Sequence, residues 1–329
     1  MHFSLRTPTL MALLDRHAHI LRTQLDGVYD GGVDPIHDAR VATRRIRELL
    51  ALVPRVPGRD DEDNVARGYK KIGRALGKVR DVDVQIALLR NLEDHTPQTG
   101  ASMVLIRKYY EDDRLERTRA LIKTLERIDV ATLIEAVTDV QPTSLRRRLT
   151  TNGWRQQLRH LLQARAHNAL EAIAHATGIY FPKRAHRARI AIKQLRYAVE
   201  IAQATGHSEL QQPGKTLRKG QEILGDLHDR QELSDTLAGY RKEEGVDPEH
   251  VQLAQQVMER EVTQLHGEYL SRRSALRDAC NEIDRAASRY RRPGQAAAVG
   301  AALAVTGILY NRQMLAGKVA DPESSVAKS

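Results

Sequence analysis

Two basic stretches of the sequence carry side chains that suit the binding of a large anion. The first reads H37-D-A-R-V-A-T-R-R-I-R47, and the second reads H186-R-A-R-I-A-I-K-Q-L-R196, 149 residues later. In each, a histidine is followed by arginines or lysines at steps of three and four residues, which place side chains on one face of an α-helix. Because a guanidinium group can grip two phosphate oxygens at once, these stretches predict a phosphate-binding surface.

The matching positions extend into a second helix, which indicates an internal duplication. L76-G-K-V-R-D81 aligns with L224-G-D-L-H-D229 at an offset of 148, close to that of the first pair. A nearly constant offset over two helices favours a repeat over chance. The candidate binding residues are His37, Arg40, Arg44, Arg45, Arg47, Arg67, Lys70, Lys71, Arg74 and Lys78 in the first copy, and His186, Arg189, Lys193, Arg196, Lys215, Arg218 and Lys219 in the second.

The first copy carries few acids beside these cations. Like charges four residues apart destabilise a helix by about 0.2–0.5 kcal/mol per pair, so a stripe that keeps them is easiest to understand if an anion fills it. An ordinary solvated basic surface is the alternative. For His37 and His186, a phosphate contact competes with a role as a helix cap. Neither lies beside a nucleophile or carboxylate pattern, so we predict no catalytic base.

Two carboxylates and two glycines recur beside the stripes. Asp81 and Asp229 are expected to orient neighbouring guanidinium groups, and Gly77 and Gly225 to let a helix or a phosphate chain approach. In the second copy Glu222 and Asp226 stand where the first has Arg74 and Lys78, so its stripe is partly acidic. A metal site built from Glu222, Asp226 and Asp229 is the weaker interpretation, and we predict neither a metal nor a cofactor.

The composition limits the class of partner. Lys and Arg exceed Asp and Glu by 52 to 42, giving a net charge of +10, which is typical of chains that meet a polyanion. Aromatic residues make up only 4%, so base-stacking platforms for single-stranded nucleic acid are scarce. A lone cysteine, Cys280, excludes a disulfide framework, and no secretory signal is recognisable, so we expect a cytoplasmic protein.

Gly and Pro clusters separate long runs without strand-like alternation, which predicts an all-α fold. Helices are expected at about 8–30, 34–54, 60–94, 100–129, 144–177, 182–205, 209–243 and 247–290. They form two tandem four-helix halves, 8–140 and 144–290, with long antiparallel helices. Residues 291–329 hold a small-residue apolar run, 296–310, and a tail expected to be disordered. That run is short for a membrane span; a buried or oligomer-forming helix and a peripheral contact to a membrane or granule remain open.

With its paired motifs, the sequence resembles the CHAD domain family, whose name stands for conserved histidine α-helical domain. The resemblance implies two four-helix bundles related by pseudo-twofold symmetry, with basic residues lining a central groove or pore that binds inorganic polyphosphate. By this resemblance, the histidines and the basic residues of the two stretches quoted above are expected to bind the ligand. Gln194 and His228 replace Arg45 and Arg80 in the second copy, which suggests weaker binding there.

We therefore predict non-catalytic binding of inorganic polyphosphate, in association with polyphosphate-containing granules. Some family members carry a triphosphate-hydrolysing domain that opens with an E-x-E-x-K strand, and no such motif occurs in this sequence. The alternative is general binding of nucleic acid or other polyanions by the same surface, which needs backbone contacts alone. The oligomeric state is left open.

Overall fold

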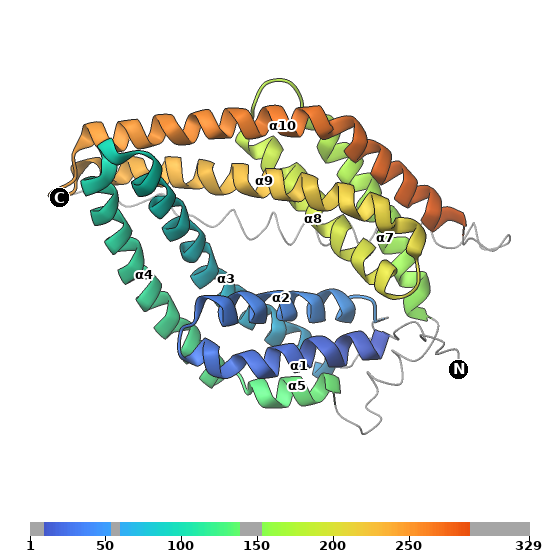
Figure 1. Cartoon of the computed structure of the whole chain (residues 1–329). Coiled ribbons are helices and arrows are strands. Elements are labelled where there is room, and N and C mark those ends of the chain that lie inside the picture. The colour runs from blue at the N-terminus through green and yellow to red at the C-terminus, as the bar shows by residue number, and fades with distance from the viewer. Residues whose placement is uncertain (1–9, 54–59, 139–152, 290–329) are drawn as a thin grey trace, which may run out of the picture. The chain divides into compact units, whose positions relative to one another are not determined.

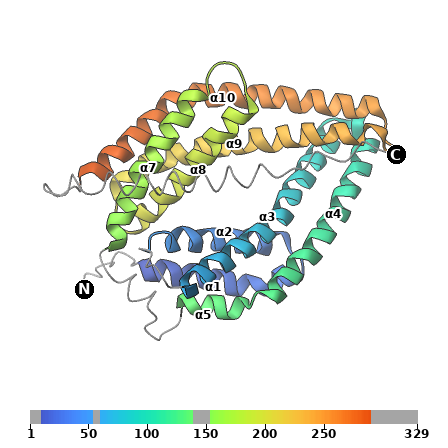
Figure 2. The same ribbon diagram turned by 180° about the vertical axis from the view of Figure 1, so that it is seen from behind.

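The computed structural model describes residues 10–53, 60–138 and 153–289, which form helices and no β-strand (Figures 1 and 2). The predicted all-α class is therefore confirmed. The helices are α1 (Leu10–Tyr29), α2 (Val33–Leu50), α3 (Asp60–His95), α4 (Gly100–Arg127), α5 (Val130–Thr138), α7 (Gly153–His175), α8 (Pro182–Ala204), α9 (Gln211–Leu237) and α10 (Pro248–Arg289), with short 3₁₀ turns at 97–99, 208–210 and 238–242.

One helix is missing from the sequence prediction, and its capping explains it. Helix α5 follows α4 almost directly, because Asp129 starts a new helix by accepting hydrogen bonds from the main-chain N–H (3.0 Å) and hydroxyl (2.6 Å) of Thr132. Val130, Ile134 and Val137 then face the core. The expectation of four helices in the first half was therefore wrong, since the described part of that half contains five.

The first turn shows how the sequence brings α1 and α2 together. Gly31 has a φ of 74°, a left-handed conformation that glycine adopts without steric cost. Gly27 permits close contact, since a Cβ there would lie 2.5 Å from Cγ of Pro35 at the start of α2. The chain can thus reverse within a few residues and pack α2, which carries the first basic stretch, against α1.

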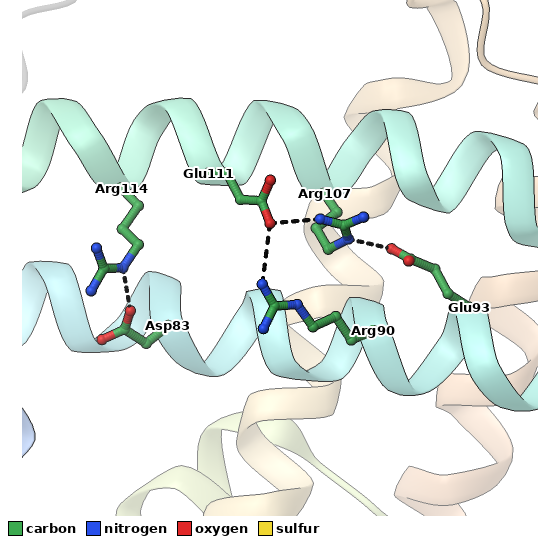
Figure 3. Close-up of polar contacts among 6 residues, drawn as sticks. All are labelled: Asp83, Arg90, Glu93, Arg107, Glu111 and Arg114. Atoms are coloured by element: carbon green, nitrogen blue, oxygen red, sulfur yellow. Dashed lines mark hydrogen bonds and ion pairs between the residues drawn. The ribbon is translucent and has the colours of Figure 1, made fainter. Parts of the chain in front are cut away.

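Ion pairs hold α3 against α4 (Figure 3). Arg107 donates to Glu93 at 2.7 Å and to Glu111 at 2.6 Å. About two helical turns further along α4, Nε of Arg114 lies 2.5 Å from Oδ1 of Asp83, whose side chain is only 3% exposed. The register between these two long helices is therefore set by charge as well as by apolar packing.

Two apolar clusters form the core of the described residues. The larger includes residues from every α-helix of the described chain, from α1 to α10. The smaller lies where the C-terminal end of α3 and the start of α4 meet the end of α9 and the start of α10; its members are Leu89, Leu92, Met103, Ile106, Leu233, Leu237, Val246, Val251, Ala254 and Met258. Both clusters contain residues from either predicted half, so residues up to 287 pack as one compact unit.

Several sequence predictions fall outside the described residues. These are the boundary between 140 and 144, the start of the helix expected at 144, and the segment 291–329 with its apolar run. The internal duplication and its pseudo-twofold relation also stay predictions. No helix among the described residues is long and apolar enough to cross a membrane.

Candidate polyanion-binding site

Helices α2 and α8, which carry the two basic stretches, meet around one aromatic ring. The guanidinium groups of Arg44 and Arg45 on α2 lie 4.5 Å and 5.2 Å from the centre of the Tyr197 ring on α8, and that of Arg196 lies 4.9 Å from it. Tyr197 is buried, with 2% of its surface exposed. Stacking on a ring face suits guanidinium groups and fixes their planes.

Six side chains are gathered here, which we call the central cationic cluster: Arg40, Arg44 and Arg45 from α2, with Arg189, Lys193 and Arg196 from α8. All six are half-buried. They are close enough across the two helices that the charges of Arg44 and Arg40 act on Lys193. The structure thus brings together members of both predicted stripes.

Carboxylates form ion pairs with part of this cluster. Glu200, on α8, pairs with both Arg45 and Arg196, and Arg196 also donates to Oε1 of Gln221 at 2.7 Å. A further ion pair between helices joins Arg165 on α7 to Glu48 on α2 at 2.7 Å. Arg45 and Arg196 were predicted as ligands, and the structure shows them in ion pairs that join α2 to α8. Much of their charge is already compensated.

Three members of the cluster have no such compensation. Among the described residues, no carboxylate lies within 4 Å of Arg44, Arg189 or Lys193 to form an ion pair. Burial, together with the charges of Arg44, Arg189 and Arg40, lowers the pKa of Lys193 to about 8. Burial likewise lowers the pKa of both arginines, which nevertheless stay charged at neutral pH. Positive charge is therefore concentrated where water is partly excluded.

Arg40 connects the cluster to α3. Its Nη1 lies 3.1 Å from Oδ1 of Asp81, and the guanidinium group extends across Gly77, where a Cβ would stand 3.9 Å from Nε of Arg40. The corresponding positions on α9 differ. Asp229 feels the charge of Arg189 but forms no ion pair with it in the described structure, and a Cβ on Gly225 would meet nothing within 4 Å.

The two predicted histidines lie near the starts of α2 and α8. His37 is exposed at the start of α2, and partial burial of its ring together with the charge of Arg80 lowers its pKa. The ring of His186 packs against that of His228, with 4.8 Å between ring centres. Burial, aided by Arg189, lowers the pKa of His228 to about 4, so this ring is neutral at physiological pH.

The other predicted cations are exposed on α2, α3 and α9. These are Arg47, Arg67, Lys70, Lys71, Arg74, Lys78, Lys215, Arg218 and Lys219. Arg67 donates to Oδ1 of Asn64 at 2.7 Å, and Lys219 lies 3.9 Å from Glu222. Arg218 is near enough to Arg196 for its charge to lower that pKa. These cations are therefore exposed on α2, α3 and α9, and the charge of Arg218 reaches the cluster.

A family model for the CHAD domain matches residues 12–238, more than half of the chain. The chain belongs to the CHAD domain family. Among solved structures it is similar to the CHAD domain from the plant Ricinus communis, at 20% identity and a TM-score of 0.58, over 89% of this chain and 96% of that one. It is also similar to PptA from Streptomyces chartreusis, at 16% identity and a TM-score of 0.54, over 83% of this chain and 97% of that one. These likenesses show the fold. A search of curated proteins found no match.

Sequence reasoning missed several residues of this CHAD domain site. Tyr197, which directly follows the second basic stretch, was given no role, and Glu48, Arg165 and Glu200 were not singled out. A signal was present for the two acids, since Glu48 and Glu200 follow Arg44 and Arg196 by four residues, the spacing of a helical ion pair. Which cation each acid would take could not be read from that spacing alone.

The acidic residues of α9 are grouped differently from the weaker sequence interpretation, which combined Glu222, Asp226 and Asp229. In the structure His228, Asp229 and Glu232 offer ligand atoms that all lie within 4.8 Å of one another. Burial raises the pKa of Asp229 to about 6, with the charges of Asp226, Glu232 and Asp81 acting in the same direction. Glu222 lies instead beside Lys219.

Proposed function

We propose that this CHAD domain binds inorganic polyphosphate at the central cationic cluster and catalyses no reaction on it. One observation carries the proposal: α2 and α8 place Arg44, Arg189 and Lys193 together, half-buried and without an ion pair among the described residues. Cations that are partly buried without an ion pair are costly for the free protein. An anion that enters the cluster relieves that cost, so binding energy is available before any contact is optimised.

The arrangement suits a chain of phosphates better than a single one. The exposed lysines and arginines of α3 and α9 extend the positive surface beyond the cluster, so successive phosphate groups of one flexible chain can be held at separate points. Guanidinium groups can each take two phosphate oxygens, and those held on the Tyr197 ring lose little freedom on binding. Multiple contacts along one chain raise affinity through effective concentration.

Nucleic acid is the competing ligand, and the aromatic residues argue against it. Tyr197, the ring at the centre of the cluster, is buried beneath three guanidinium groups and offers no face for a base. Binding of DNA or RNA would have to rest on phosphate contacts alone, which gives steep salt dependence. Association with polyphosphate-containing granules follows from the proposed ligand and is part of the same proposal.

A competition titration tests this function. Labelled long-chain polyphosphate is titrated with the full chain at two salt concentrations, and duplex DNA and RNA are then added in excess. We expect tight binding that the nucleic acids do not displace. Displacement by this excess of nucleic acid would show a general polyanion surface and overturn the proposed specificity. To test the absence of catalysis, the polyphosphate is sized on a gel after prolonged incubation, and shortened chains would contradict it.

A further inference from the structure

We propose that the loop between α7 and α8 attaches the protein to a membrane surface that carries anionic lipids. The chain turns at Gly178, whose φ of 43° lies in the left-handed region, and then runs through Ile179, Tyr180 and Phe181 into α8. In both views of the structure this loop rises past α10 as a projecting arch (Figures 1 and 2). A segment that projects in this way can meet a flat surface before the helices beside it do.

Two apolar side chains of this loop point into solvent. Ile179 is 76% exposed, the highest value among the large apolar residues that the structure describes, and Phe181 is 44% exposed. Phe181 has extended backbone angles, φ −127° and ψ 110°, and successive side chains of an extended segment point to opposite sides. Tyr180 between them faces inward, with its ring centre 5.1 Å from that of His266 on α10. The alternation leaves Ile179 and Phe181 on the outer side of the loop.

Both ends of the loop are held in place, so its apolar tip stays exposed. Arg273 on α10 donates from Nε to the main-chain oxygen of Ile173 at 3.0 Å, and from Nη2 to that of Ala174 at 3.4 Å, near the end of α7. At the start of α8, the main-chain oxygen of Phe181 accepts a hydrogen bond from the N–H of Arg184 at 2.9 Å. A loop that is already ordered loses little freedom when it binds.

Basic side chains border the apolar tip. Lys183, Arg184 and Arg187 are exposed in the first two turns of α8, and steps of three and four residues place Arg187 on the same face as the other two. The first turn of α8 contains no acid, and none of the three cations forms an ion pair with another described residue. The guanidinium group of Arg184 lies 4.4 Å from the centre of the Phe181 ring. Positive charge is therefore held at the edge of the apolar tip.

This combination matches the chemistry of an anionic bilayer, whose surface attracts cations and whose interior accepts apolar side chains. A soluble protein partner fits less well, because stable protein interfaces bury about 1,200–2,000 Å² in total, far more than two side chains on a projecting loop offer. The attachment is independent of the proposed function, since the loop and the central cationic cluster are separate sets of residues.

Sedimentation with vesicles tests this attachment. The full chain is mixed, at physiological ionic strength, with vesicles of phosphatidylcholine alone or of phosphatidylcholine with one quarter phosphatidylglycerol. We expect binding to the anionic vesicles, and at least tenfold weaker binding by Ile179→Ser/Phe181→Ser. The matched control, Val33→Ser/Leu115→Ser, removes two aliphatic side chains of 46% and 53% exposure from other helices and should bind as the wild type does. Equal binding by the two variants, or none by the wild type, would overturn the proposal.

A tryptophan at the tip shows which part of the chain meets the lipid. The chain has one tryptophan, Trp154, which is buried with 5% of its surface exposed. Because an indole ring favours the membrane interface, the emission of Ile179→Trp should shift to shorter wavelength when anionic vesicles are added. An unchanged emission spectrum in the vesicle-bound protein would contradict insertion of the loop. Circular dichroism checks that each variant folds.

A third comparison separates the loop from the central cationic cluster. Lys183→Gln/Arg187→Gln should lose binding to anionic vesicles, whereas Arg44→Gln/Lys193→Gln should keep it. The reverse result would mean that the cluster itself holds the lipid headgroups, and the proposed attachment would be wrong. Affinity for polyphosphate does not enter this comparison, so failure of the proposed function and failure of the attachment give different results.

Discussion

The guanidinium group of Arg44 on α2 lies 4.5 Å from the centre of the Tyr197 ring on α8. Two basic stretches that stand 149 residues apart in the sequence thereby converge on one buried ring. The cluster exists only while both helices are in place, since neither stretch alone gathers its cations at this density. Stability of the contact between α2 and α8 and affinity for a polyanion should therefore change together.

Replacing Glu200 tests the ion pairs that join α2 to α8 in the cluster. Its carboxylate pairs with Arg45 and Arg196, and all three side chains are at least 80% buried. Glu200→Gln leaves two nearby guanidinium groups without their shared anion, so we expect the free energy of unfolding to fall by about 2 kcal/mol. Denaturant unfolding at low salt measures this change.

The matched control for that variant is Asp113→Asn. Asp113 also pairs with an arginine four residues away, Arg117, at 2.8 Å, but both side chains are 41% exposed. A solvated pair of this kind contributes little, and we expect a loss below about 0.5 kcal/mol. Equal destabilisation by the two variants would show that the ion pairs of Glu200 stabilise the fold no more than an exposed pair does.

Lys193 should make polyphosphate binding depend on pH. Its pKa is lowered from 10.5 to about 8 by burial and by Arg44, Arg189 and Arg40, with Asp81 acting the other way. Since the folded pKa is below the unfolded one, stability of the free protein rises as the pH goes from about 8 to 10.5. A bound anion needs the charged form, so affinity should fall as the pH rises above about 8.

The variant Lys193→Arg isolates that effect, because a guanidinium group keeps its charge over the whole range. Affinity for labelled polyphosphate is compared at pH 7 and pH 9 at constant ionic strength. We expect the wild type to lose several-fold more affinity than Lys193→Arg over this interval. The same pH dependence in both proteins would mean that Lys193 does not titrate in the site.

Two glycines of α9 should respond in opposite ways to alanine. A Cβ on Gly225 would meet nothing within 4 Å, so Gly225→Ala should stabilise the helix by about 1 kcal/mol. A Cβ on Gly220 would lie 2.6 Å from Cδ2 of Leu276, which is fully buried, so Gly220→Ala should lower the melting temperature. Thermal unfolding of the two variants checks both signs. A rise for Gly220→Ala would contradict the packing of α10 on α9.

The helices themselves could be read from the sequence because Gly and Pro mark nearly every turn. The start of α8 at Pro182 and the end of α3 near His95 fall within one or two residues of expectation. Helix α5 was missed because the expected helix was ended at 129 and no Gly or Pro marks the start of a further helix there. Only the capping role of the Asp129 side chain, two hydrogen bonds to Thr132, distinguishes a new helix from a continued one.

The candidate site could be predicted in its residue types but not in its pairing. Helical spacing places Arg40 and Arg44 on one face of α2, whichever partner they meet. That Arg45 would pair with Glu200, rather than remain open to a ligand, depends on how α2 packs on α8. Likewise, helical spacing alone gave Asp226 and Asp229 the same face, whereas in the structure His228, Asp229 and Glu232 are the residues brought together.

The most direct test of the central claim compares two double variants that remove the same charge. Arg44→Gln/Lys193→Gln empties the centre of the cluster, while Arg119→Gln/Lys123→Gln removes two exposed cations from α4. Affinity for labelled long-chain polyphosphate is measured at physiological ionic strength. Each charge-assisted contact is worth about 1.5–3 kcal/mol, so we expect at least a tenfold loss in the first variant and less than a twofold loss in the second. Equal losses would show that polyphosphate responds to net charge alone, and the central cationic cluster would not be its site.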